Sequence, residues 1–327
     1  MSAIIQIEHL TREFDGLIAV NDLSLTVERG ELFGLVGPDG AGKTTTMRLL
    51  CGILEPSGGD ARVAGFSIRT DRERIKERIG YMPQRFGLYG DHSVMENLSF
   101  YADIYQVPRG ERPEKIRRLL EFSQLGPFTD RLAENLSGGM KQKLGLACAL
   151  IHTPEILFLD EPTCGVDPVS RRDLWKILYE LAKQRVTVFM STAYLDEAER
   201  CTRVGLMHGG RLMVCASPDS IKEDLPGEVW EMRTEDNRTA RERIRAMEGV
   251  TADLVGDTLH LILDRPGADM DFLLRRLNQE GVRVLEKRKV PASLEDAFMH
   301  LIHREREVAL VTAQAPQKIG FPKRDTS

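Results

Sequence analysis

The sequence predicts an α/β fold with a mainly parallel sheet, followed by a small α+β domain. In residues 1–222, short apolar runs alternate with longer stretches of helix-forming residues. Strands that alternate with helices favour a doubly wound sheet, with helices packed on both of its faces. The clearest strand candidates are LFGLVG at 32–37, EILFLD at 155–160 and VTVFMS at 186–191.

The end of this first region and the remainder of the chain follow other patterns. Two apolar runs at 203–208 and 211–216, separated by two glycines, predict a closing hairpin. Over residues 223–303 the expected elements follow the order βαββαβ, which is typical of a ferredoxin-like domain. Residues 304–327 end in a polar segment interrupted by prolines, and we expect them to form a disordered tail.

Composition limits the classes of function. A chain of 327 residues, 42% apolar and 29% charged, is an ordinary globular protein of about two domains. Its formal net charge of -5 gives no electrostatic basis for binding nucleic acid in bulk. The five cysteines include no CxxC pair, which favours reduced thiols in the cytoplasm over disulfides or a zinc site.

Neither a membrane span nor a leader is expected. No apolar run reaches the roughly 18–20 residues that cross a bilayer. The N-terminus, MSAIIQIEHL, lacks the charged-then-apolar pattern of a signal peptide. We therefore expect a cytosolic protein that can dock on a partner in a membrane.

A glycine-rich loop follows the first strand candidate. Residues 37–45 read GPDGAGKTT and match the pattern G-x-x-x-x-G-K-[ST]. Glycines allow backbone N–H groups to surround phosphates, and the N-terminus of the following helix adds positive potential. In such loops the lysine reaches the β- and γ-phosphates and the hydroxyl binds Mg²⁺. Because a strand precedes it and a helix follows it, we interpret the loop as a phosphate site and not as an ordinary turn.

An acidic pair follows the second strand candidate. Asp160 lies at the end of the strand, where its carboxylate can hold Mg²⁺ through water. Glu161 can polarise an attacking water, as a general base or as an orienting group. Such a pair by itself is more often a solvated loop start or a helix cap. The phosphate loop in the same chain favours the catalytic interpretation.

A second anion site is suggested by LSGGMKQKLGLACAL, which begins at Leu136. Ser137, Gly138 and Gly139 precede a helix, and a helix N-terminus attracts anions. A chain with one phosphate loop has no obvious need of a second anion site. A dimer in which each subunit caps the ATP of its partner does need one. Standing alone, the motif would be read as a serine N-cap and two glycines that open a core helix.

The order of the motifs carries a resemblance to a known family. After the phosphate loop come YMPQ at 81–84, LSGGM at 136–140, LFLDEP at 157–162, GVDP at 165–168 and STAYLDEAE at 191–199. This order resembles the ATP-binding subunit of an ATP-binding cassette (ABC) transporter over residues 4–222. Its details look most like the bacterial drug-efflux branch, whose subunits often carry a small C-terminal domain.

The resemblance implies a P-loop nucleotidase cassette that binds ATP with Mg²⁺. The aromatic ring of Phe14 would stack on adenine, although a core residue of an edge strand remains the alternative for that position. The phosphates would be bound by Gly37, Pro38, Asp39, Gly40, Ala41, Gly42, Lys43, Thr44 and Thr45. Mg²⁺ would be held by Thr44, Gln84 and Asp160, and the catalytic residues would be Glu161 and Gln84.

The same resemblance implies partners. Ser137, Gly138 and Gly139 would meet the γ-phosphate bound by an opposite cassette, which is a second copy or a different chain. Asp167 would lie at the dimer seam, with a simple turn as the alternative. A helical subdomain over about 85–150 would meet an integral-membrane permease. The protein would then be peripheral on the inner face of the cell membrane and export a substrate that the sequence does not identify.

Three positions depart from the family pattern. Met140 replaces a commoner glutamine, and Asp39 places a negative charge where asparagine is usual. Ala193 stands where the family has a histidine that donates to the γ-phosphate. Tyr194 is a poor substitute, because consecutive side chains of extended backbone point to opposite faces. We therefore expect a slow hydrolytic site, unless another donor replaces the imidazole.

Two other functions remain open. The first is a regulatory cassette that binds ATP with little turnover, for which Ala193 is the argument. The second is a soluble cassette protein that acts on ribosomes or nucleic acid. Proteins of that kind usually carry two cassettes and basic tracts, whereas this sequence has one cassette and an acidic balance.

Overall fold

The computed structural model describes residues 2–85, 87–245, 247, 249–263 and 270–314. The chain divides between Ser220 and Ile221 into two compact units. We call them the cassette unit and the C-terminal unit, and each is described by itself.

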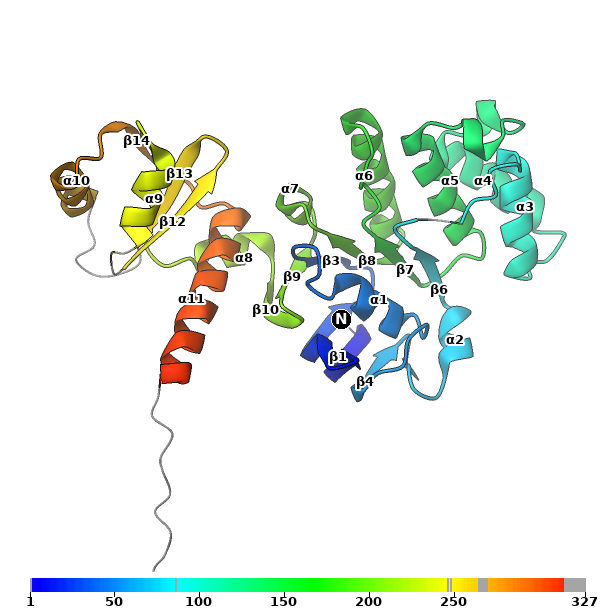
Figure 1. Ribbon diagram of the computed structural model, residues 1–327. Coiled ribbons are helices and arrows are strands. Elements are labelled where there is room, and N and C mark those ends of the chain that lie inside the picture. Colours follow the sequence, from blue (N-terminus) through cyan, green and yellow to red (C-terminus); the bar gives the residue numbers. More distant parts are fainter. Residues whose placement is uncertain (1, 86, 246, 248, 264–269, 315–327) are drawn as a thin grey trace, which may run out of the picture. The chain divides into compact units, whose positions relative to one another are not determined.

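The apolar runs of the cassette unit form a mainly parallel sheet (Figure 1). All residues of β3, β7 and β8 are buried, which explains why the sequence shows continuous apolar runs there instead of alternation. Neighbouring strands are parallel except for the β9–β10 hairpin, so the predicted fold class is confirmed. The strand order is β10 (Arg211–Ala216), β9 (Arg203–His208), β3 (Leu32–Val36), β8 (Thr187–Thr192), β7 (Ile156–Asp160) and β6 (Ile79–Met82).

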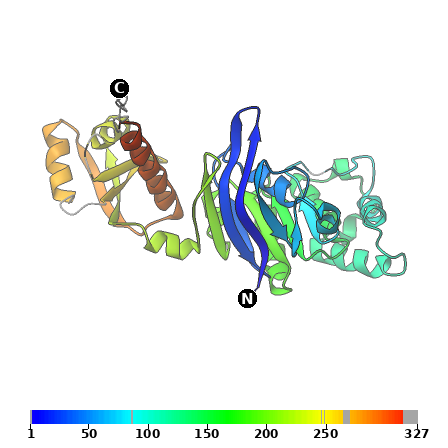
Figure 2. The same cartoon turned by 90° about the horizontal axis from the view of Figure 1, so that it is seen from below.

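A second, antiparallel sheet packs below the first and was not predicted from the sequence. Its strand order is β2 (Leu17–Glu28), β1 (Ala3–Phe14), β4 (Gly58–Val63) and β5 (Phe66–Ser67). Figure 2 shows β1 and β2 as a long hairpin. Helix α1 (Lys43–Leu50) lies between the two sheets, where Met47 and Leu50 share one core with Leu10 and Phe33. The phosphate loop is thereby fixed between two sheets.

The stretch of about 85–150 forms helices at the β6 edge of the parallel sheet (Figures 1 and 2). Ser93 and Glu96 form a reciprocal capping box that starts α3. The helices have a core of their own, which includes Leu98, Leu120 and Leu144. The elements are α2 (Arg72–Lys76), which precedes this stretch, then α3 (Val94–Ile104), α4 (Arg112–Ser123), η1 (Gly126–Phe128), η2 (Ala133–Asn135) and α5 (Gly138–Leu150).

Helix α6 (Pro168–Lys183) packs against β3 and β8 on the other face of the sheet from α1 (Figure 1). It is followed by the short α7 (Leu195–Ala198) and by α8 (Pro218–Glu223), at the boundary between the units. Helix α6 begins after the loop that follows β7, and α7 begins shortly after β8, so both start at the carboxyl-terminal side of the sheet. Ligands of open α/β sheets bind at that edge.

The C-terminal unit has the predicted βαββαβ order. Its antiparallel sheet has the strand order β12 (Val250–Val255), β13 (Thr258–Leu263), β11 (Glu228–Thr234) and β14 (Val284–Val290). Helices α9 (Asn237–Arg245) and α10 (Met270–Gln279) share a core with one face of this sheet. This strand order is that of a ferredoxin-like unit.

The prediction of a disordered tail over residues 304–327 is wrong for its first part. Helix α11 (Leu294–Gln314) packs on β12 and β13 and continues through part of the range 304–327. Two ion pairs hold it there, His260 with Asp296 and His303 with Asp253, each at 2.8 Å. The segment EREVALVTAQ is rich in helix-forming residues, which outweighs its polarity. Residues 315–327 lie outside the described residues.

Candidate functional site

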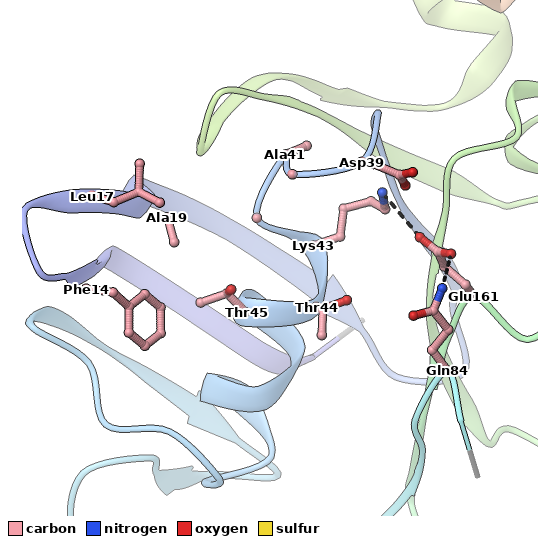
Figure 3. Close-up of a pocket in the computed structure, with 12 residues that line it drawn as sticks. Phe14, Leu17, Ala19, Asp39, Ala41, Lys43, Thr44, Thr45, Gln84 and Glu161 are labelled. Atoms are coloured by element: carbon pink, nitrogen blue, oxygen red, sulfur yellow. Dashed lines mark hydrogen bonds and ion pairs between the residues drawn. The ribbon is translucent and has the colours of Figure 1, made fainter.

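The phosphate loop opens onto a cavity of about 530 Å³ in the cassette unit. Figure 3 shows its two ends, with Phe14 and Leu17 at one and Lys43, Gln84 and Glu161 at the other. The lining residues are Phe14, Leu17, Ala19, Asp39, Gly40, Ala41, Gly42, Lys43, Thr44, Thr45, Gln84 and Glu161. One end is therefore apolar and the other charged, which suits a ligand with a flat ring and an anionic tail.

Two glycines of the loop are required by its surroundings. A Cβ on Gly37 would lie 2.1 Å from the Met207 carbonyl oxygen, and one on Gly42 would lie 2.3 Å from that of Ala19. Gly42 also has a φ of 101°, a conformation that side chains disfavour. The sequence pattern thus reflects close backbone packing as well as access to the ligand.

The Lys43 side chain is only 4% exposed and points into the charged end of the cavity. Its ammonium donates to the carbonyl oxygens of Gly37 at 2.7 Å and Pro38 at 3.0 Å. It also lies 3.5 Å from the Glu161 carboxylate. The ammonium thus lies among two neutral carbonyls and one carboxylate at the charged end of the cavity.

Asp160 is buried at the end of β7 and accepts two hydroxyl hydrogen bonds. Thr44 Oγ1 donates to its Oδ1 at 3.0 Å, and Ser191 Oγ donates to the same atom at 2.6 Å. Burial of the neighbouring Tyr81, together with the carboxylate of Asp160, raises the pKa of Tyr81 to about 12.

Glu161 and Gln84, the two predicted catalytic residues, are in direct contact. Gln84 Nε2 donates to its Oε2 at 2.9 Å (Figure 3). The backbone of Glu161 has a φ of 50°, an uncommon conformation for a residue other than glycine. Ser191 holds it there, because the Glu161 N–H donates to the Ser191 carbonyl oxygen at 3.2 Å and to its hydroxyl at 3.0 Å. Strain of this kind is concentrated at functional sites.

At the apolar end of the cavity, the aromatic ring of Phe14 is packed against an arginine side chain. Phe14 ends β1, is 37% exposed and lines the cavity with Leu17 and Ala19. The guanidinium of Arg12 lies 4.3 Å from the centre of the Phe14 ring. A ring with one cationic neighbour and a cavity beside it is suited to stacking on a second flat group.

The predicted Mg²⁺ ligands fit a hard cation. Thr44 and Asp160 already lie in hydrogen-bond contact, and Gln84 reaches the neighbouring Glu161. Hydroxyl, carboxylate and amide oxygens are the donors that Mg²⁺ prefers, and it commonly keeps water and substrate phosphates as its other ligands. Among the described residues, no cluster of three or more His, Cys, Asp or Glu could hold a metal ion. The predicted Mg²⁺ ligands include only one carboxylate, that of Asp160.

The motif at Ser137 lies elsewhere in the unit and does not line the cavity. Ser137 caps α5 by accepting from the Met140 N–H at 3.3 Å. Asp167 caps α6 and accepts from the N–H groups of Val169 and Ser170, each at 3.0 Å. A hydrogen bond from the Ser170 side chain has the largest effect on the pKa of Asp167. Together with the two backbone hydrogen bonds, it holds that pKa below its ordinary value.

The two capped helices meet at Gly139. A Cβ at this position would lie 2.2 Å from Ser170 Oγ, so the close approach requires glycine. Gly138 is exposed, and a Cβ there would have only the Gly165 carbonyl oxygen, at 3.7 Å, as a near neighbour. We call Ser137, Gly138, Gly139 and Asp167 the signature face. Ser137, Gly138 and Asp167 are exposed, so this face presents the N-termini of α5 and α6 to solvent.

Ala193 is exposed directly after β8 and is not among the residues that line the cavity in the described part of the chain. The ring of Tyr194 lies 5.1 Å from the Arg171 guanidinium. Asp39 is exposed, so its charge faces solvent at the cavity rim.

Sequence reasoning missed Ser191, which bonds both acidic residues. A serine at the end of a buried apolar strand, in FMST, was a usable signal. It also missed Glu197, a buried carboxylate of α7.

Comparisons with known proteins agree with this geometry. Residues 20–164 match the family model described as ABC transporter. The probable multidrug ABC transporter ATP-binding protein YbhF of Escherichia coli is 43% identical over 305 residues, covering 92% of this chain and 52% of that protein. The chain thus spans about half the length of this curated relative.

Two further likenesses cover nearly the whole of the other protein. The Nod factor export ATP-binding protein I of Cupriavidus pinatubonensis is 35% identical over 308 residues, covering 93% of this chain and 92% of that protein. The solved structure of cbiO1 from Clostridium perfringens, described as part of the ABC transporter complex cbiONQ, is 27% identical with a TM-score of 0.64. It matches 75% of this chain and 97% of its own.

A search for membrane spans among the described residues finds no helix with the necessary length and apolarity.

Proposed function

The chain belongs to the family of ABC transporter ATP-binding proteins, and we propose that it hydrolyses ATP to power export through a separately encoded permease. ATP-binding domains of this family are generally ATPases coupled to transport. The observation that carries the proposal is the convergence of Lys43 and Gln84 on Glu161, beside Asp160 and Thr44. The names of the two curated relatives, which refer to multidrug transport and Nod factor export, support the direction of transport.

In the proposed site, the adenine stacks on Phe14 and the phosphates lie in the loop from Gly37 to Thr45. Lys43 gives charge to the β- and γ-phosphates, as the N–H groups of the loop do. Glu161 holds the proton of the attacking water or orients that water, and Gln84 positions the Glu161 carboxylate. Thr44, Asp160 and Gln84 would hold Mg²⁺, which neutralises charge on the β- and γ-phosphates when bound.

We propose that the signature face completes the site of another cassette. None of its four residues lines the phosphate-loop cavity, and the N-terminus of α5 carries partial positive charge that suits an anion. Ser137 and the N–H groups at Gly138 and Gly139 would donate to a γ-phosphate across a dimer seam at Asp167. The description of cbiO1 as part of a transporter complex supports assembly with further subunits.

The helices α3, α4 and α5 are proposed to meet the permease at the inner face of the cell membrane. The C-terminal unit is proposed to support pairing or regulation, since none of its described residues lines the cavity.

Ala193 supports a slow site. A family histidine would donate to the γ-phosphate, and loss of one such donor typically costs roughly 10²–10³ in rate. Glu161, Asp160 and Gln84 remain in place, which favours slow turnover over none. A regulatory cassette with little turnover is the second candidate, and the same residue is its only support.

The test is ATP hydrolysis by the purified full-length chain. We expect turnover that is lost in Glu161→Gln and that rises about tenfold or more in Ala193→His. No turnover above that of Glu161→Gln would favour the regulatory cassette. Brisk wild-type turnover that the histidine does not change would show that another donor has replaced the imidazole.

A further inference from the structure

A fully buried carboxylate lies beneath the loops that carry the acidic residues. Glu197, in α7, is 0% exposed. Its Oε2 accepts from Thr163 Oγ1 at 2.8 Å and from Thr192 Oγ1 at 2.9 Å. Its Oε1 lies 3.5 Å from Nε of Arg171 in α6, which is an ion pair without a hydrogen bond.

The two threonines lie close in sequence to Glu161 and to Ala193. Thr163 is two residues after Glu161, in the turn that leads to Asp167. Thr192 ends β8, directly before Ala193. Its carbonyl oxygen accepts from the Gly37 N–H at 3.2 Å, and its hydroxyl accepts from the Tyr194 N–H at 3.0 Å.

One side chain therefore links three segments at the carboxyl-terminal edge of the sheet: the phosphate loop through Thr192, the turn after Glu161 through Thr163, and the segment at Ala193. The guanidinium of Arg171 adds the Tyr194 ring to the same cluster, at 5.1 Å. Glu197 itself does not line the cavity, so it does not contact a nucleotide there.

Burial of this carboxylate needs a reason other than stability. Moving an ionised group out of water is costly, and replacing a buried ion pair with apolar residues is often neutral or stabilising. A buried carboxylate, however, favours the one arrangement in which its hydroxyl donors stay bonded to it. If a threonine hydroxyl moved away, the carboxylate would remain buried without that hydrogen bond, which is costly. The cluster thus selects one relative position of the loops.

We propose that Glu197 is a positioning residue that fixes the Glu161 turn against the segment at Ala193. The inference rests on the proposed hydrolysis only for its kinetic consequence. Where the family has a histidine at the γ-phosphate, this chain has Ala193, which has no side-chain donor, so the alignment of Glu161 depends more on the residues packed beneath it. Misplacement by about 1 Å can cost roughly 10²-fold in rate.

The first experiment separates turnover from binding. In Glu197→Ala, kcat falls roughly 10–100-fold while KM for ATP and the ATP dissociation constant stay within about threefold. Glu197→Gln keeps kcat within about threefold of wild type, because one amide oxygen can accept from both threonines. Glu31→Ala is the matched control, since Glu31 is also buried and paired with an arginine, Arg203 at 3.3 Å, but precedes β3 at the opposite edge of the sheet. It lowers the melting temperature without lowering kcat.

The second experiment does not depend on turnover. Hydrogen exchange of the folded full-length protein is followed in peptides over 161–167 and 190–195, with α3 as an internal reference. Both peptides exchange faster in Glu197→Ala and are unchanged in Glu31→Ala. If Glu197→Ala fails to fold, the double variant Thr163→Val/Thr192→Val replaces it. It removes both hydroxyl donors to Glu197 without leaving a cavity, and both peptides should again exchange faster than in wild type.

The outcomes are distinct. Slower turnover with faster exchange in both peptides supports the inference. Unchanged exchange overturns it whatever the turnover, and so does wild-type kcat in Glu197→Ala. Absence of turnover in wild type contradicts the proposed function alone, because the exchange result still decides the role of Glu197.

Discussion

The phosphate-loop cavity and the signature face, which we propose as two anion sites, are built differently. In the cavity, the Glu161 carboxylate lies 3.5 Å from the Lys43 ammonium and 2.9 Å from the Gln84 amide nitrogen, and Asp160 next to it is buried. The signature face is a pair of helix N-termini capped by their own side chains, Ser137 and Asp167, and open to solvent. The first is a cavity, whereas Ser137, Gly138 and Asp167 of the second are exposed on the surface.

This difference indicates a division of labour. Binding should depend on the cavity, and turnover should depend on both regions. A second chain that brings its signature face to this cavity would supply the missing wall. Changes confined to one region should therefore separate affinity from pairing.

The largest expected effect is on nucleotide affinity. Lys43→Ala removes the buried ammonium at the charged end of the cavity, and we expect ATP to bind on the order of 10–100-fold more weakly. Lys176→Ala, at an exposed lysine of α6, is the control and should bind as wild type does. Isothermal titration with equal affinity in all three proteins would rule out the loop as the phosphate site.

Removing one predicted metal ligand should change the metal requirement. Thr44→Val keeps the shape of the side chain but loses the hydroxyl that lies 3.0 Å from Asp160. We expect the Mg²⁺ concentration for half-maximal ATP binding to rise roughly tenfold. Thr45→Val, which also lines the cavity, should leave that concentration unchanged. A matching rise in both variants would contradict the assignment of Thr44.

A smaller effect is expected when the signature face loses a cap. Asp167→Ala removes the carboxylate oxygen that accepts from the Val169 and Ser170 N–H groups of α6, and it should lower the melting temperature by about 2–4 °C. Asp167→Asn also caps well, so its melting temperature should stay near that of wild type. Any loss of ATP-driven pairing in Asp167→Asn then belongs to the charge at the seam and not to the helix. Equal stability of both variants would mean that the cap contributes little.

The smallest expected effect is that of removing the C-terminal unit. A chain that ends after Glu223 keeps α8 and every residue that lines the cavity. Its ATP affinity should remain within about twofold of that of the full chain, because the units have separate cores. A folded fragment that no longer binds ATP would show that the cavity depends on the second unit.

The comparison also shows which features were visible in the sequence. The phosphate loop, β3 and β7 are local patterns, in which a continuous apolar run ends in residues with one chemical role. The order of the motifs placed Gln84 with the acidic pair before any contact was known. The ferredoxin-like order of the C-terminal unit was equally local.

What the sequence did not predict depends on residues far apart in the chain. Ser191 bonds to Asp160 and Glu161 across neighbouring strands, 31 and 30 positions away. Glu197 meets Thr163 at a separation of 34. The antiparallel sheet went unnoticed because its strands alternate buried and exposed residues, a weaker signal than a continuous run.

The most direct test of the division between the two regions is the molar mass of Glu161→Gln measured by light scattering with ATP, with ADP and without nucleotide. Because hydrolysis is blocked, we expect the mass to double with ATP alone. Adding Gly138→Glu places a negative charge on the exposed signature face without a clash in its own chain, and pairing should be lost. Adding Gly126→Glu, at an exposed glycine with open space around it, should leave pairing intact. A monomer with ATP, or equal pairing with and without Gly138→Glu, would contradict the proposal that the signature face of one copy completes the cavity of another.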